Sequence, residues 1–273
     1  MRRGASRESG AARAGLVLAL AALVGCSAGD RAGESKPVEN GEGQEARHRR
    51  GLLAARPHAP ERRAGGRGRQ ELRAGGRTLG LIYAPEVPPG QSTGLLLLLH
   101  GARGGAEGII EPFEPAADRL RLVLFAPQSR GRTWDIIEDG AFGTDVALID
   151  EALALIFDQR AIDAERVAVG GFSDGASYAL SLGLGNGQLF RAILAFSPGF
   201  ASPVGVAGRP LVFVSHGTFD SVLPIDRTSR RIVPLLRRAG LDVQFVEFAG
   251  DHVLPDEVLE AGLARIAPAR PAH

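Results

Sequence analysis

One serine lies in a short pattern that is typical of activated nucleophiles. Residues 171–175 have the spacing G-x-S-x-G, with Ser173 at the centre. In a nucleophile elbow, a strand turns sharply into a helix at the serine, and the flanking glycines permit the strained turn and close packing of strand and helix. The β-branched run 166–170 favours a buried strand before Ser173, and the small apolar run 176–182 favours a helix after it. An ordinary strand-to-helix turn would also satisfy so short a pattern.

A serine hydroxyl needs partners before it can attack a carbonyl group. At neutral pH it is a poor nucleophile unless a base lies within hydrogen-bond reach and a third group orients that base. Asp220 follows the predicted strand 210–217, and His252 follows the predicted strand 242–248. Because the carboxyl ends of parallel strands lie at one edge of a sheet, we expect both side chains to meet Ser173 there. The residues therefore predict a triad of Ser173, His252 and Asp220.

Other residues of the same types compete for these roles. Asp251 adjoins His252 but comes from the same loop, and Asp226 lies further along, where we expect it to cap the next helix. Ser197 and Ser215 lie at strand ends but lack the glycine spacing of an elbow. The remaining histidines lie before glycines at strand ends, in the N-terminal segment or at the last position, and are His100, His216, His48, His58 and His273.

Strands and helices must alternate along the chain to position these residues. Apolar and β-branched runs predict strands at 71–73, 77–83, 94–101, 121–127, 166–170, 192–196, 210–217 and 242–248. Helical spacing is found up to about residue 119 and over 144–159, 176–182, 227–239 and 255–266. The glycine-rich turn 74–76 predicts an antiparallel hairpin at the start. This alternation implies an α/β fold, with a mostly parallel central sheet and helices on both faces.

Four motifs together resemble those of one family. They are Leu99-His100-Gly101, the pattern at 171–175, His216-Gly217-Thr218-Phe219-Asp220 followed by Val222 and Pro224, and Gly250-Asp251-His252. From about residue 72 to 267 the chain resembles the α/β-hydrolases, and within them the phospholipase/carboxylesterase group and its dienelactone-hydrolase relatives. The order Ser, Asp, His along the chain is the order of this family. The resemblance implies a serine hydrolase that cleaves carboxylic esters through an acyl-enzyme, without a metal or an organic cofactor.

The resemblance also implies roles for further residues. We expect the backbone N–H groups of Asp174 and Ala102 to stabilise the oxyanion, with the N–H of Arg103 as an alternative. Trp134 lies in the loop after the next strand, where we expect it to line the substrate pocket together with Arg103. A half-buried surface aromatic is the alternative for Trp134. Two histidines are expected to shape the turns before their glycines instead of accepting protons, namely His100 and His216.

The fold leaves other functions open. The same residues would serve a peptidase, or an esterase that acts on polymers such as polyhydroxyalkanoate or feruloylated polysaccharide. A surface lipoprotein whose hydrolase fold only binds a ligand is a third hypothesis, which the complete triad disfavours. No long insertion separates the predicted strands, and the absence of a large lid favours short or medium acyl groups. The formal charge is only +1, so that no nucleic acid is expected as a partner.

The N-terminus has the features of a bacterial lipoprotein signal peptide. Several arginines precede an apolar run at 16–25, which is too short for a transmembrane helix. Leu23-Val24-Gly25-Cys26 resembles a lipobox, in which the cysteine becomes the lipidated N-terminus after cleavage; a plain secretory signal is the alternative. Cys26 is the only cysteine, so that no internal disulfide can form. Because Ser27 follows it, lipoprotein sorting rules imply the outer membrane of a Gram-negative cell envelope, with the membrane as a partner.

Residues 26–69 are predicted to form a disordered tether. The segment is rich in Gly, Glu and Arg and has little apolar periodicity, so that it buries too little apolar surface to order itself. The arginines in the second half of the segment would contact anionic lipid; the alternative is that the segment is only a solvated linker. The predicted domains are a signal peptide over 1–25, this tether over 26–69 and an α/β-hydrolase catalytic domain over 70–268.

Overall fold

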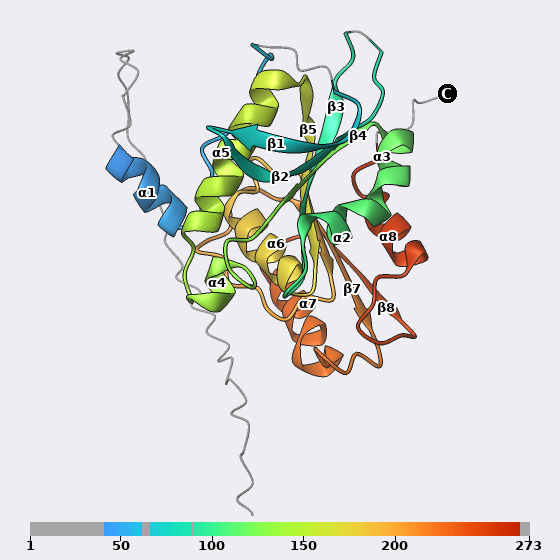
Figure 1. Ribbon diagram of the computed structural model, residues 1–273. Helices are drawn as coiled ribbons and strands as arrows, with labels where there is room; N and C mark the ends of the chain where they lie inside the picture. Colours follow the sequence, from blue (N-terminus) through green and yellow to red (C-terminus); the bar gives the residue numbers. More distant parts are fainter. Residues whose placement is uncertain (1–40, 62–65, 89, 268–273) are drawn as a thin grey trace, which may run out of the picture. The chain divides into compact units, whose positions relative to one another are not determined.

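A computed structural model describes residues 41–61, 66–88 and 90–267 of the chain (Figure 1). The predicted signal peptide, the lipidation site Cys26 and the first part of the predicted tether lie outside these residues. No helix in the described ranges is long and apolar enough to cross a membrane.

The described residues form a central sheet of eight strands in the order β1-β2-β4-β3-β5-β6-β7-β8. The strands are β1 (Gly68–Ala74), β2 (Arg77–Ala84), β3 (Thr93–Leu99), β4 (Leu122–Pro127), β5 (Ile162–Phe172), β6 (Ala192–Phe196), β7 (Leu211–Gly217) and β8 (Val243–Phe248). The β1–β2 hairpin is antiparallel, as is the pairing of β2 with β4. All other pairs in the sheet are parallel. The structure therefore confirms the predicted mostly parallel sheet.

Helices cover both faces of the sheet (Figure 1). They are α1 (Gly41–Arg49), α2 (Ala106–Ile110), α3 (Glu114–Leu120), α4 (Asp135–Glu138), α5 (Thr144–Gln159), α6 (Asp174–Gly185), α7 (Ser229–Arg238) and α8 (Asp256–Leu263), with short 3-10 turns η1 (Glu111–Phe113) and η2 (Ile225–Arg227). Buried side chains of α5, α6 and α7 belong to one core, and those of α2, α3 and α8 belong to the other.

The central strand β3 shows why an uninterrupted apolar run forms here. Leu95, Leu97 and Leu99 pack in the first core, whereas Leu96 and Leu98 pack in the second. Successive side chains of a strand point to opposite faces, so that a strand covered by helices on both sides must be apolar at every position. All five leucines are fully buried. This strand carries the loop that reaches the candidate active site.

The segment 41–61 differs from the predicted disordered tether. Helix α1 packs against α5, and Leu53 behind it is only 1% exposed. The buried carboxylate of Asp150 on α5 accepts hydrogen bonds from the backbone N–H groups of Ala54 and Ala55, both at 2.8 Å. Its other oxygen lies 2.9 Å from Nε2 of His48. We call residues 41–55 the N-terminal strap, because they are fixed along the domain by these contacts.

Polar side chains of the domain hold the strap where the sequence offers few apolar residues. Asn186, at the end of α6, accepts a hydrogen bond from the N–H of Leu53 at 2.9 Å and donates one to the carbonyl of Gly51 at 2.6 Å. Such buried side-chain bonds to backbone leave no periodic signal in the strap itself. The composition of the segment therefore predicted disorder, because the partners that order it lie 102 and 133 residues away along the chain.

Candidate active site

The backbone at Ser173 has the strained geometry of a nucleophile elbow. Its φ and ψ are 58° and −119°, at the junction between β5 and α6. A Cβ at Gly175 would overlap the carbonyl oxygen of Leu99, and a Cβ at Gly171 would lie 2.7 Å from the same oxygen. Only glycine fits at either position, because β3 passes directly against the turn. The motif is therefore required by packing, and the alternative of an ordinary strand-to-helix turn does not fit this backbone.

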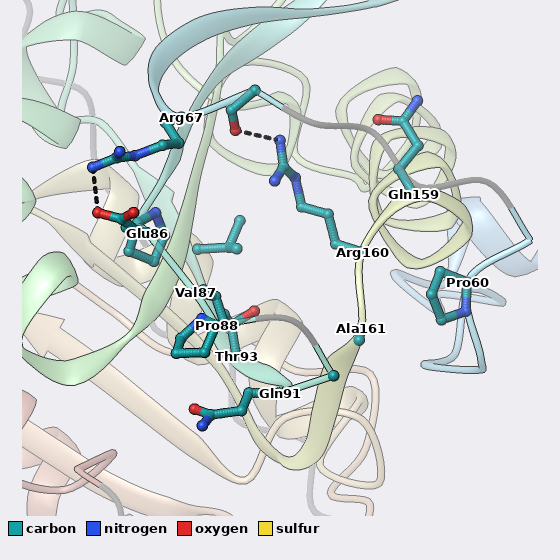
Figure 2. Close-up of a pocket in the computed structure, with 14 residues that line it drawn as sticks. Pro60, Arg67, Glu86, Val87, Pro88, Gln91, Thr93, Gln159, Arg160 and Ala161 are labelled. Atoms are coloured by element: carbon teal, nitrogen blue, oxygen red, sulfur yellow. Dashed lines mark hydrogen bonds and ion pairs between the residues drawn. The ribbon is translucent and has the colours of Figure 1, made fainter.

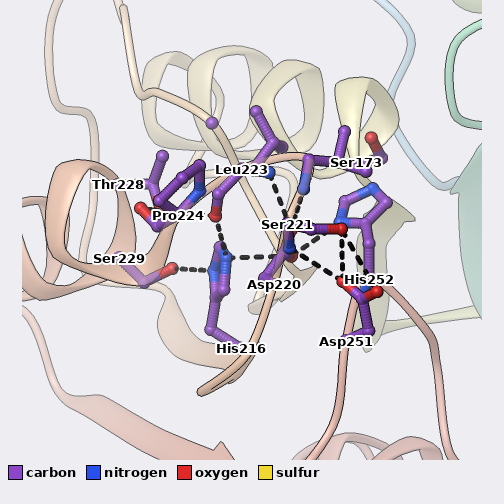
Figure 3. Close-up of polar contacts among 12 residues, drawn as sticks. Ser173, His216, Asp220, Ser221, Leu223, Pro224, Thr228, Ser229, Asp251 and His252 are labelled. Atoms are coloured by element: carbon purple, nitrogen blue, oxygen red, sulfur yellow. Dashed lines mark hydrogen bonds and ion pairs between the residues drawn. The ribbon is translucent and has the colours of Figure 1, made fainter.

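His252 and Asp220 are joined by a short hydrogen bond (Figure 3). The Nδ1 atom of His252, in the loop after β8, lies 2.6 Å from Oδ2 of Asp220, in the loop after β7. The Asp220 carboxylate is fully buried, whereas the His252 side chain is 13% exposed. The other carboxylate oxygen accepts the N–H groups of Val222 at 3.0 Å and Leu223 at 2.7 Å. The loop after β7 thus orients the imidazole of the loop after β8, because Asp220 binds Nδ1 of His252.

The imidazole of His252 lies alongside the elbow. Its ring centroid is 4.7 Å from that of Phe172, the residue before Ser173, and Figure 3 draws Ser173 beside the imidazole. The structure has no hydrogen bond between the hydroxyl of Ser173 and His252, although both residues are described. Contacts of this kind are often loose without substrate and tighten in the Michaelis complex. The arrangement brings the three predicted residues to the same edge of the sheet.

The rival acids have other partners. Asp251 accepts hydrogen bonds from the N–H of Ser221 at 2.8 Å and from its hydroxyl, and these bonds lower the pKa of the Asp251 carboxyl. Asp251 thereby ties the β8 loop to the β7 loop. Asp226 pairs with Arg230 at 2.8 Å on the surface. Among the described carboxylates, Asp220 is the one bonded to the His252 ring.

The loop after β3 lies against Ser173 and offers a free backbone donor. A Cβ at Gly101 would lie 3.3 Å from Cβ of Ser173, so that the two backbones are in close contact. The N–H of Arg103 already donates to the carbonyl of Arg132 at 2.8 Å, which removes the alternative donor of the oxyanion hole. Among the described residues, the N–H groups of Ala102 and Asp174 have no protein acceptor. The side chain of Arg103 is exposed.

Trp134 does not line a pocket, contrary to the prediction and to its half-buried alternative. Its side chain is fully buried, and Nε1 donates a hydrogen bond to the carbonyl oxygen of His100 at 2.8 Å. The indole packs between the rings of His100 and Tyr178, at centroid distances of 4.7 and 5.0 Å. Because a residue with no exposed surface cannot contact substrate, Trp134 supports the loop after β3 from behind.

The two histidines at strand ends are buried and bonded on both ring nitrogens, as turn-shaping residues would be. His100 lies 2.8 Å from the carbonyl of Gly101 through Nδ1, and its Nε2 accepts the N–H of Ser129 at 3.1 Å. Burial lowers the pKa of both His100 and His216. His216 also lies 3.1 Å from Oδ2 of Asp220, a contact that the sequence analysis missed. No periodicity in the sequence marked this contact, because it joins the end of β7 to the loop after it.

A cleft lies at the opposite end of the strands from Ser173, Asp220 and His252 (Figure 2). This cleft of about 410 Å³ is lined by residues at the amino ends of β3 and β5, among them Thr93, Arg160 and Ala161. Arg67 and Glu86 form an ion pair at its rim, at 2.7 Å. Ser173, Asp220 and His252 follow the carboxyl ends of their strands, and the cleft is therefore separate from the candidate active site. The described residues contain no group of three or more His, Cys, Asp or Glu side chains that could hold a metal ion.

Comparisons with known proteins show similarity to one family and to several solved structures. Residues 137–265 match the family model for Phospholipase/Carboxylesterase. Esterase PE8 is 23% identical with a TM-score of 0.55, over 67% of this chain and 96% of that protein. The fluorophosphonate-binding serine hydrolase FphF of Staphylococcus aureus is 15% identical with a TM-score of 0.57, over 73% of this chain and 98% of that one. An S-formylglutathione hydrolase from Agrobacterium tumefaciens is 16% identical with a TM-score of 0.55, over 77% of this chain and 100% of that one.

No curated protein matches the chain in sequence. The sheet order, the elbow between β5 and α6 and the similarity to these solved structures agree with one another. The chain has the α/β-hydrolase fold.

Proposed function

We propose that the chain is a serine hydrolase that cleaves carboxylic esters. The observation that carries the proposal is the 2.6 Å hydrogen bond between Asp220 and His252 beside the strained elbow at Ser173. The match of residues 137–265 to the Phospholipase/Carboxylesterase family supports an ester as the substrate. The similar structures named an esterase and an S-formylglutathione hydrolase support acyl transfer from an oxygen or sulfur leaving group.

The reaction begins with attack of the Ser173 hydroxyl on the ester carbonyl. Nε2 of His252 takes the hydroxyl proton, while Asp220 holds Nδ1 and stabilises the imidazolium that forms. The free N–H groups of Ala102 and Asp174 donate to the oxyanion of the tetrahedral intermediate. The alcohol leaves with the proton from His252, and water then attacks the acyl-enzyme by the same route. Asp174 is well placed as a donor because it begins helix α6, whose N-terminus favours negative charge.

Labelling with a fluorophosphonate probe tests the proposed nucleophile. The wild-type protein is expected to react, and Ser173→Ala is expected to stay unlabelled while retaining its thermal unfolding transition. A panel of p-nitrophenyl esters and aminoacyl amides then separates an esterase from a peptidase. A protein that is folded, unlabelled and inactive on the whole panel would instead be a binding module.

We also propose that Cys26 carries a lipid that anchors the protein to the cell envelope. The lipobox-like residues before Cys26 support this placement. Metabolic labelling with a fatty-acid analogue is expected to mark the wild-type protein in a bacterial host and to leave Cys26→Ser unmarked. Label on both proteins, or on neither, would refute the anchor without affecting the proposed chemistry.

A further inference from the structure

A second imidazole contacts the carboxylate of Asp220 (Figure 3). The side chain of His216, near the end of β7, has no exposed surface, and its Nε2 lies 3.1 Å from Oδ2 of Asp220. The same Nε2 lies 2.7 Å from the carbonyl oxygen of Leu223. Because Oδ2 is also bonded to Nδ1 of His252, one carboxylate oxygen lies between two histidines.

The partners of His216 define where its proton lies. The Leu223 carbonyl and the Asp220 carboxylate can only accept hydrogen bonds, so that Nε2 must carry a proton. Nδ1 lies 2.7 Å from the hydroxyl of Ser229, which can donate as well as accept. Burial lowers the pKa of His216, which favours a neutral ring that donates from Nε2 and accepts at Nδ1.

Few other charged groups face this ring. Besides Asp220, they are His252 and Glu247, which pairs with His216 across β7 and β8. Glu247 in turn binds the guanidinium of Arg230 at 2.9 Å, and this partner offsets its negative charge. A neutral His216 with its proton on Nε2 is therefore compatible with all of these neighbours.

The Asp220 carboxylate is held on both of its oxygens. Oδ1 accepts two backbone N–H groups, from Val222 and Leu223, and Oδ2 faces the ring nitrogens of His216 and His252. A carboxylate has about four acceptor positions. Three of them accept hydrogen bonds here, and Nε2 of His216 lies 3.1 Å from Oδ2 on the remaining side. Rotation of the group would break at least one of these bonds.

We propose that His216 is a positioning residue, which holds Asp220 toward His252 by donating a hydrogen bond from a neutral imidazole. The inference rests on the proposed function, since it assigns a role within the same triad. A neutral donor fixes the carboxylate without cancelling its charge, and that charge remains available to the His252 imidazolium. A cation at the same position would compete with His252 for Asp220.

Two substitutions separate positioning from packing. His216→Met keeps a similar volume but removes the donor, whereas His216→Gln keeps an amide N–H near the position of Nε2. His216→Met is expected to lower kcat about 10- to 100-fold with KM changed less than about threefold, as for the loss of a hydrogen bond to a charged group. His216→Gln is expected to restore most of kcat. His58→Met, at a partly exposed site beside Asp158, is the matched control and is expected to behave as wild type.

The pH profile of kcat/KM supplies a readout that loss of packing would not move. In His216→Met the freed carboxylate binds the imidazolium less firmly, so that the acidic limb is expected to shift to lower pH. If His216→Met leaves both kcat and the acidic limb unchanged, or shifts the acidic limb to higher pH, the inference is overturned. If His216→Met fails to fold, His216→Leu serves instead, because it also lacks the Nε2 donor. Its limb is expected to shift in the same direction, and an unchanged limb with unchanged kcat would also overturn the inference.

Failure of the inference differs from failure of the proposed function. A wild-type protein that hydrolyses no ester and takes no fluorophosphonate label contradicts the proposed function itself. A wild-type protein that is active, with a His216→Met variant of equal kcat and equal pH profile, contradicts only the role of His216.

Discussion

The indole Nε1 of Trp134 donates a hydrogen bond to the carbonyl oxygen of His100 at 2.8 Å. This bond joins the loop after β4 to the end of β3, directly before the loop that carries Ala102. Tyr178 of α6 packs on the other side of the indole. A buried aromatic residue with no access to substrate thereby fixes the backbone that is proposed to stabilise the oxyanion.

Trp134→Phe is expected to lower both activity and stability. Phenylalanine keeps one aromatic ring but leaves the buried carbonyl of His100 without a donor, at a cost of about 1–3 kcal/mol in the free energy of unfolding. The cavity left by the smaller ring adds to this cost. A shifted oxyanion loop should lower kcat about tenfold or more. Tyr178→Phe, which removes the bond to Asp135 at 3.1 Å, is the matched control and is expected to lose stability with a smaller change in kcat. Equal losses of kcat in both variants would contradict the link to the oxyanion loop.

Gly175→Ala is expected to prevent folding or to cost more than about 3 kcal/mol. The added methyl group would overlap the carbonyl oxygen of Leu99, and neither β3 nor α6 can move without opening the core. Gly108→Ala, in α2, is the control, because nothing lies within 4 Å of its Cβ position and alanine favours helix by about 1 kcal/mol. Chemical denaturation of both variants measures the difference. A stable Gly175→Ala protein would mean that the elbow is looser than described.

The sequence predicted the sheet because its parallel strands are buried on both faces. An apolar run such as 94–101 has one stable arrangement, and the described strand β3 spans Thr93–Leu99. Helix α5 coincides with the predicted 144–159, since its apolar face repeats with helical spacing. Helix α4 was not predicted, because a single turn has too few residues to show a period.

Long-range polar contacts account for what the sequence did not predict. The strap is fixed by Asp150 and Asn186, and the role of Trp134 depends on a carbonyl in another loop. The link between His216 and Asp220 depends on side-chain rotamers within one turn. None of these partners is marked by periodicity or by composition. The meeting of Ser173, Asp220 and His252 at one edge of the sheet was predictable because each residue follows a predicted strand.

Leu53→Ala is expected to release the N-terminal strap. The side chain is 1% exposed, and truncation of a buried leucine typically costs about 2–5 kcal/mol. Limited proteolysis should then cut within residues 41–61 at protease concentrations that leave the wild-type segment intact. Leu52→Ala, at the half-buried neighbouring position, is the control and should change cleavage less. Equal cleavage of wild type and Leu53→Ala would refute the packing of the strap on the domain.

The stability of the fold should fall as pH rises from about 4 to about 6 through one buried carboxyl. Asp145 accepts the N–H groups of Arg130 and Asp135, both at 2.9 Å, and burial raises the pKa of Asp145 to about 6. In the unfolded chain an Asp has a pKa of about 3.9, so that between these values the folded state binds more protons. The stabilisation that the protonated Asp145 carboxyl contributes to the folded state is therefore complete below about pH 4 and is lost by about pH 6 or above.

Asp145→Asn isolates this contribution because the amide does not titrate. The difference in free energy of unfolding between wild type and variant is expected to decrease by up to about 3 kcal/mol from pH 4 to pH 7. Urea denaturation at several pH values measures it. A difference that stays constant over this range would contradict the raised pKa.

Phe219 is expected to contribute to the choice of substrate. It precedes Asp220 and is 72% exposed, while Val222 and Val253, beside the same triad, are 62% and 49% exposed. The bonds between Ser221 and Asp251 tie together the two loops that carry these three apolar side chains and also Asp220 and His252. An apolar acyl or alcohol group that covers Phe219 would gain hydrophobic contact area that an acetyl group does not reach.

Phe219→Ser should therefore lower kcat/KM for p-nitrophenyl hexanoate about 5- to 30-fold, the equivalent of about 1–2 kcal/mol of apolar contact. The value for p-nitrophenyl acetate should stay within about twofold, because the short acyl group leaves the ring uncovered. Val87→Ser, in the cleft at the opposite end of the strands, is the control and should change neither value. An equal loss of kcat/KM on both esters would mean that Phe219 instead helps to position Asp220. No loss on either ester would exclude Phe219 from the substrate-binding surface.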